Sequence, residues 1–229
     1  MRLCALLLFA LFIAGPCVAR EHGDADHLVP VNPHQAWLGH YVEAVRSRLT
    51  LNSFSYLQMV MTPAFVGESA VRLHPESGDR EMEKVDKVFL TYAVASENIY
   101  YATQTPKPGK KPEDVSVTVT TIEFPKPLAL RLYKLWSKML LRTRYPQEPL
   151  SMVTDGTSIE FGCEKLGWGS VYGEAYFPTR AKSPMLFSDA GLALMDYGKA
   201  APAERAQAAK KIEAAADRLE AYLKKHPAK

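Results

Sequence analysis

The pattern of apolar and polar positions divides most of the chain into helical and extended segments. Helices are predicted over residues 35–49, 127–144, 183–197 and 202–225. In three of them apolar residues recur on one side, which predicts the side that packs against a core. The expected buried residues are Trp37, Val42 and Val45 in the first, Leu128, Leu132, Leu135, Trp136 and Met139 in the second, and Ile212, Ala216, Leu219 and Leu223 in the last.

Extended segments are predicted where apolar residues alternate with polar ones, or where β-branched and aromatic residues cluster. Residues 85–95 are apolar on both faces, as expected of a strand inside a covered sheet. Residues 115–124 show the clearest period of two. The sequence Gly167-Trp168-Gly169 predicts a turn that joins the last two strands as a hairpin. The expected strands are 54–62, 69–73, 85–95, 99–103, 115–124, 157–163 and 170–177.

The order of these segments predicts an α+β fold. Strands that are grouped along the chain, with helices segregated from them, favour a mostly antiparallel sheet with helices packed on one face and a C-terminal helical pair. Residues 34–229 are expected to form this single domain, which ends in the two helices. Residues 20–33 are polar and contain two prolines, so they are predicted to be a flexible arm.

Residues 1–19 have the composition of a secretory signal peptide. A basic start is followed by an apolar run and by small residues that end at Ala19. We expect cleavage after Ala19 and a periplasmic mature protein. Cleavage would remove two of the three cysteines with the signal peptide. The mature protein would then contain only Cys163 and could form no internal disulfide. Pro16 immediately precedes Cys17, which disfavours a lipid-anchoring signal at that cysteine.

Composition and charge exclude several classes of protein. Hydrophobic residues make up 47% of the chain and charged residues 23%, as in an ordinary globular protein. The formal net charge is +3, so the composition indicates no nucleic-acid partner. Beyond the leader, no apolar stretch is long enough for a membrane span.

Residues with catalytic or metal-binding chemistry lack a supporting pattern. The sequence contains no Gly-x-Ser-x-Gly elbow, no His-Glu-x-x-His helix, no phosphate-binding glycine loop and no Cys-x-x-Cys pair. Cys163 follows Ile159 and Phe161 at a period of two, which predicts a buried structural thiol. The histidines and aspartates of residues 22–40 are suitable metal ligands, but no rigid setting is visible for them. We therefore predict no catalytic residue, no metal site and no cofactor.

A basic stripe is the first candidate partner-binding surface. Arg131, Lys134, Lys138 and Arg142 fall on one side of the helix predicted over residues 127–144. Such a stripe suits an acidic partner or an anionic envelope polymer. The alternative is a solvated face opposite the packed side of the helix.

The hairpin around Gly167 supplies a second candidate surface. Trp168, Tyr172 and Tyr176 are concentrated there, and aromatic side chains often anchor protein interfaces. Val171 and Ala175 alternate with the two tyrosines, so the tyrosines are expected on the more exposed side. In the alternative interpretation, these aromatic rings cover the core.

One segment carries a resemblance to a known group of proteins. The sequence Asp155-Gly156-Thr157-Ser158-Ile159-Glu160-Phe161, followed by Trp168, Gly173, Pro178, Ser183-Pro184 and a helix, resembles a pattern in uncharacterised bacterial envelope proteins. Some proteins of that sort act as periplasmic immunity proteins against antibacterial effectors. The resemblance covers residues 155–197 and implies no particular binding residue.

Three hypotheses about function follow from these features. The first is a non-enzymatic periplasmic binding protein, an inhibitor or immunity protein that occludes a toxic effector protein. The second is an envelope hydrolase that acts on cell-wall glycan through carboxylates. The third is a structural or assembly protein of the envelope that oligomerises through its C-terminal helix.

Overall fold

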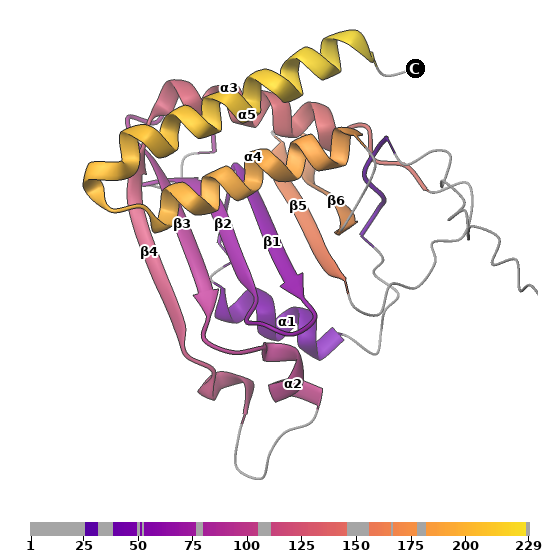
Figure 1. Cartoon of the computed structure of the whole chain (residues 1–229), viewed down its shortest axis with the longest axis vertical. Helices are drawn as coiled ribbons and strands as arrows, with labels where there is room; N and C mark the ends of the chain where they lie inside the picture. Colours follow the sequence, from indigo (N-terminus) through magenta and orange to yellow (C-terminus); the bar gives the residue numbers. More distant parts are fainter. Residues whose placement is uncertain are drawn as a thin grey trace, which may run out of the picture.

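The computed structural model describes residues 26–31, 39–49, 51, 53–76, 80–104, 111–145, 156–165, 167–177 and 182–227. Its centre is a six-stranded antiparallel sheet with the strand order β4-β3-β2-β1-β5-β6 (Figure 1). The predicted α+β class is confirmed. The strands are β1 Leu57–Pro63, β2 Ser69–Pro75, β3 Val88–Ala95, β4 Val117–Phe124, β5 Thr157–Lys165 and β6 Gly169–Phe177.

Three long helices gather on one face of the sheet, as predicted (Figure 1). The helix α3 (Lys126–Leu140) packs on β5 and β6, and α4 (Lys182–Lys199) packs on β2, β3 and β4. The C-terminal helix α5 (Arg205–Lys225) lies along α4 and α3. Every residue of the predicted apolar stripes of α3 and α5 is buried. Among the described residues, no helix has the length and apolar character needed to cross a membrane.

An aromatic cluster fills the core between the sheet and these helices. Trp136 is fully buried, and its ring contacts Phe161 of β5 and Phe187 of α4, with centroids 5.7 Å and 4.3 Å away. The indole N–H donates to the carbonyl oxygen of Gln58 at 3.3 Å, so the ring is buried without an unpaired donor. This cluster joins two helices to the middle of the sheet.

Two short helices pack on the opposite face at one end of the sheet. These are α1 (Gly39–Arg48) and α2 (Ile99–Gln104), which lie where β1 and β3 end (Figure 1). A smaller core forms there from Tyr41 and Val45 of α1 and apolar residues of β1, β2 and β3. Val42, predicted to be buried, is 41% exposed. The helix is instead turned so that Tyr41 faces the sheet; Trp37 lies outside the described residues.

Residues 99–103, predicted as a strand, form the helix α2. The backbone N–H groups of Ile99 and Tyr100 donate to the Glu68 carboxylate, and that of Tyr101 donates to the Asn98 side chain. These bonds satisfy donors that the first turn of a helix leaves unpaired. Glu68 comes from the start of β2, so the sequence around residue 99 does not reveal this contact.

Residues 26–31 are anchored, in contrast to the flexible arm predicted over residues 20–33. Leu28 is fully buried in the main core, and Val29 exchanges backbone hydrogen bonds with Glu174 of β6. The Asp26 carboxylate accepts a bond from the Ser183 N–H at the start of α4, at 2.8 Å. A carboxylate at this position stabilises the helix by pairing a free N–H and by its charge. The segment therefore belongs to the domain.

We expect Gly198→Ala to lower the free energy of unfolding. A Cβ at Gly198 would lie 2.5 Å from Cβ of Tyr92, an atom that cannot swing away. Such overpacking costs about 1–3 kcal/mol and outweighs the gain in helix propensity of roughly 1 kcal/mol. Gly39→Ala in α1 is the control, since a Cβ there would meet no atom within 4 Å and should not lower the free energy of unfolding. Urea denaturation that shows Gly198→Ala to be as stable as wild type would contradict this account of α4 packing.

Candidate functional site

The loop between β1 and β2 carries two large apolar side chains into solvent. Phe65 is 70% exposed and Val66 is 63% exposed. We call these two residues the apolar tip. Single exposed apolar side chains are common on protein surfaces, but two adjacent ones at the end of a hairpin form a candidate contact surface. Tyr101 of the nearby helix α2 is also exposed, at 47%.

Hydrogen bonds from a buried asparagine hold the backbone of this loop. The Asn98 side-chain amide donates to the carbonyl oxygens of Pro63 and Val66, both at 3.1 Å. Its own oxygen accepts the Tyr101 N–H, so one side chain ties the loop to α2. A Cβ at Gly67 would lie 2.0 Å from the carbonyl oxygen of Ala95, and glycine is required for this close approach to β3. The apolar tip is therefore presented on a fixed backbone.

The carboxylate of Glu68 reinforces the base of the loop. Glu68 is fully buried and accepts hydrogen bonds from the Tyr41 hydroxyl at 3.0 Å and from two N–H groups of α2. Burial, followed by the charge of Glu68, raises the pKa of Tyr41 well above its usual range. The Glu68 carboxylate, the Tyr41 hydroxyl and the two N–H groups of α2 are thus paired with one another, as a rigid buried network requires.

Sequence reasoning missed the apolar tip. A local signal was present, since the segment Pro63-Ala64-Phe65-Val66-Gly67 is apolar although it joins two strands. Turns of this kind are usually built from glycine, asparagine, aspartate and serine. The exposure of Phe65 and the contribution of Asn98 both depend on the folded chain.

The structure places the predicted basic stripe beside α5. Arg131 forms ion pairs with Asp217 at 2.6 Å and Glu220 at 2.7 Å. The hydrogen bonds that Arg131 donates to Glu220 and Asp217 raise the pKa of its guanidinium. Arg142 donates to the carbonyl oxygen of His226, just beyond α5.

These contacts separate the stripe into two kinds of residue. Arg131 and Arg142 bind the C-terminal helix of the same chain, whereas Lys134 and Lys138 are exposed. The two lysines therefore retain the exposure that partner binding requires. Binding of an acidic partner by these residues stays a prediction.

The predicted aromatic residues of the hairpin do not form one surface. Trp168 lies at the β5–β6 turn and is 70% exposed, with the Lys165 ammonium 4.8 Å from its ring centre. Tyr172 and Tyr176 are half-buried and lie on the face of β6 away from α3, because Ala175 between them faces the main core. Since β1 and β5 are antiparallel, the Trp168 turn and the apolar tip lie at opposite ends of the sheet.

A pair of carboxylates lies side by side on the same face of β5 and β6. Glu160 and Glu174 are directly opposite each other in the register of the two strands. Arg46 of α1 donates to Glu160 at 3.0 Å, and the Tyr176 hydroxyl donates to Glu174 at 3.0 Å. Burial is the main cause that raises the pKa of both carboxyls, and it brings the pKa of Glu174 to about 7. Burial and the neighbouring Glu174 raise the pKa of Tyr176 to about 12.

The predicted burial of Cys163 is confirmed. Cys163 is buried at 4% exposure, with its sulfur 3.9 Å from the Ser137 hydroxyl, and burial raises the pKa of its thiol. A thiol in such a setting is unreactive. Within the described ranges, no three histidine, cysteine, aspartate or glutamate side chains are grouped as metal ligands.

Comparisons with known proteins add no identification. No family model matches the chain, and no curated protein or solved structure matches it either. The function must therefore be argued from the geometry itself.

We expect the free energy of unfolding to fall as the pH rises from about 4.5 to about 7. The folded protein keeps the Glu174 proton up to a pKa of about 7, whereas the ordinary value is 4.5. In this window the native state binds more protons than the unfolded state, so stability declines with pH and levels off above 7. The expected loss is on the order of 3 kcal/mol. Urea denaturation along the pH range measures it, and Glu174→Gln should flatten the profile; an unchanged slope would contradict the assignment.

Proposed function

We propose that this protein is a non-enzymatic binding protein of the periplasm that inhibits a toxic effector protein by occluding its active site or substrate groove. The apolar tip is the observation that carries the proposal. Phe65 and Val66 project from a hairpin whose backbone is held by Asn98 and whose base is held by Glu68. A projecting apolar pair on a fixed backbone suits insertion into a groove of a partner.

The rigidity of the loop supports binding for a thermodynamic reason. A flexible loop loses conformational entropy when it binds, which weakens the complex. The bonds from Asn98 to Pro63 and Val66 fix the loop before the partner arrives. Large apolar side chains in the centre of an interface then supply most of the affinity.

A survival assay tests this proposal. The chain, with its leader, is co-produced with each secreted toxin encoded beside its gene, and colony survival is scored. We expect the wild-type chain to restore growth against one toxin, and the variant with Phe65→Asp and Val66→Asp to fail. Trp168→Asp, which alters an exposed aromatic residue at the other end of the sheet, serves as the control. Failure of the wild-type chain to protect against any of these toxins would overturn the proposal.

One observation favours the second hypothesis, a carboxylate-based envelope hydrolase. Glu160 and Glu174 are opposite each other, and the pKa of Glu174 lies at about 7, a suitable value for a general acid. Release of soluble fragments from purified peptidoglycan, abolished by Glu174→Gln, would establish this activity and replace the inhibitor proposal. The third hypothesis receives no such support, because the apolar stripe of α5 is buried within its own chain.

A further inference from the structure

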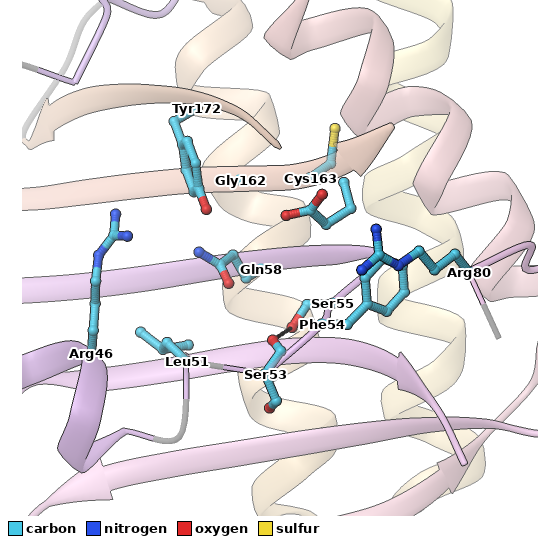
Figure 2. Close-up of a pocket in the computed structure, with 11 residues that line it drawn as sticks. Arg46, Leu51, Ser53, Phe54, Ser55, Gln58, Arg80, Gly162, Cys163 and Tyr172 are labelled. Atoms are coloured by element: carbon cyan, nitrogen blue, oxygen red, sulfur yellow. Dashed lines mark hydrogen bonds between the residues drawn. The ribbon is translucent and has the colours of Figure 1, made fainter. Parts of the chain in front are cut away.

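A pocket opens on the face of the sheet that α3 and α4 leave uncovered. Its volume is about 350 Å³, close to the lower end of the range for ligand sites. Figure 2 shows Gln58 in its centre, with Tyr172 and Arg46 on one side and Arg80 on the other. Gln58 lies near the start of β1, whereas the apolar tip follows the end of that strand. The pocket is therefore a separate site.

The floor of the pocket carries a polar side chain that faces the cavity. Gln58 is only 6% exposed, and no hydrogen bond within the described residues involves its side-chain amide. The amide nitrogen and oxygen are not among the described side-chain atoms that are fully enclosed without a partner, so they stay accessible from the pocket and are available to a ligand. A Cβ at Gly162, next to Gln58, would lie 2.6 Å from the Tyr172 ring. Glycine thus lets the tyrosine lie flat against the sheet and form a wall beside the amide.

The charges around the pocket favour a ligand with a single negative charge. Arg46 pairs with Glu160, and Arg80 lies over the Phe54 ring at 5.7 Å. Arg72 donates to Ser53 in the pocket wall, and its Nε is buried without a partner in the described part of the chain. Two carboxylates lie in the same region, Glu160, which pairs with Arg46, and Glu164, which lines the pocket. Set against the three guanidinium groups, they leave one positive charge in excess. A doubly charged phosphate would be repelled by the carboxylates more strongly than a carboxylate ligand.

We propose that this pocket binds a small ligand through a carboxylate group. Arg80 supplies the charged donor, because its guanidinium is exposed at the rim, and the Gln58 amide supplies a second donor from the floor. The rest of the ligand lies between the rings of Tyr172 and Phe54. The carboxylate belongs either to the C-terminus of a short peptide or to an acidic sugar, and both present the same planar group to Arg80 and Gln58.

Paired probes separate these two sources and test the role of charge. The mature chain is titrated with alanylalanine and its C-terminal amide, and with glucuronate and glucose, while amide NMR shifts are followed. We expect one carboxylate probe to bind with a Kd of about 1 mM or below, and its neutral counterpart to bind at least about tenfold more weakly. Binding of alanylalanine identifies a peptide ligand, and binding of glucuronate identifies an acidic sugar.

Substitutions decide whether the probe occupies this pocket. Arg80→Ala and Gln58→Ala should each weaken the bound probe about tenfold or more, whereas Lys134→Ala, on the exposed side of α3, should not. Arg80 is exposed, so its variant is expected to fold even if the Gln58 variant does not. Equal binding of charged and neutral probes, unchanged affinity in Arg80→Ala, or no binding of either acid up to about 10 mM would overturn the proposal.

Discussion

Replacing Phe65 and Val66 together with aspartate is expected to weaken binding of the protein partner by a factor of at least about 100. Both side chains are exposed in the free protein, at 70% and 63%, so the change leaves the core intact. At the centre of an interface each such residue contributes about 2 kcal/mol, and 1.4 kcal/mol corresponds to a tenfold change in affinity. Calorimetric titration with the toxin identified by the survival assay measures the effect.

A matched variant shows whether the effect is specific to the apolar tip. Trp168→Asp also removes a large exposed ring, but at the opposite end of the sheet, and should leave the affinity unchanged. Both variants should melt at the wild-type temperature. If the Trp168 variant lost the affinity and the tip variant kept it, the binding surface would be the β5–β6 hairpin instead.

Glu68→Ala is expected to lower the free energy of unfolding by about 4 kcal/mol. The substitution leaves the Tyr41 hydroxyl and the N–H groups of Ile99 and Tyr100 buried without their acceptor. It also leaves a cavity in place of a fully buried side chain. Urea denaturation measures the loss. Because α2 and Asn98 depend on the same junction, the variant should also release its partner faster.

Two further variants define the cause of this loss. Glu68→Gln keeps one acceptor oxygen and nearly the same volume, so it should lower the free energy of unfolding roughly half as much as Glu68→Ala does. Glu43→Ala removes an exposed carboxylate from the neighbouring helix α1 and should change stability by less than about 0.5 kcal/mol. A Glu68→Ala variant as stable as Glu43→Ala would show that the buried network does not hold the end of the sheet together.

The basic stripe shows how far a pattern of charged residues in the sequence predicts a binding surface. A helical period places Arg131 and Lys138 on one side of α3 correctly, because that period depends only on helix geometry. Arg142 lies beyond the end of α3 at Leu140, although the sequence predicts a helix that reaches residue 144. The helical period does not show that Arg131 faces Asp217 and Glu220 of α5, or that Arg142 reaches His226. The partner side chains are remote in sequence, and their proximity is set by how α5 packs.

The sequence did not predict the apolar tip or the pocket. The reason is related to the one for the basic stripe. Phe65 lies among apolar residues that a sequence pattern assigns to a core or a turn, and its exposure depends on the fixed loop. The pocket combines residues from α1, β1, β5, β6 and two connecting segments. That the Gln58 side chain faces this pocket is recognisable only when the neighbouring segments are placed.

The sequence by itself determined the α+β class, the apolar stripes of α3 and α5, and the burial of Cys163. Each depends on local periodicity, because a side chain at a given spacing must face the core when the element forms. Only the tertiary structure decided that residues 99–103 are helical, that residues 26–31 belong to the domain, and that Phe65 and Val66 project on a fixed loop. These features depend on hydrogen bonds that Glu68 and Asp26 accept, and that Asn98 donates, across segments remote in sequence. Such bonds form only after the chain has brought the segments together.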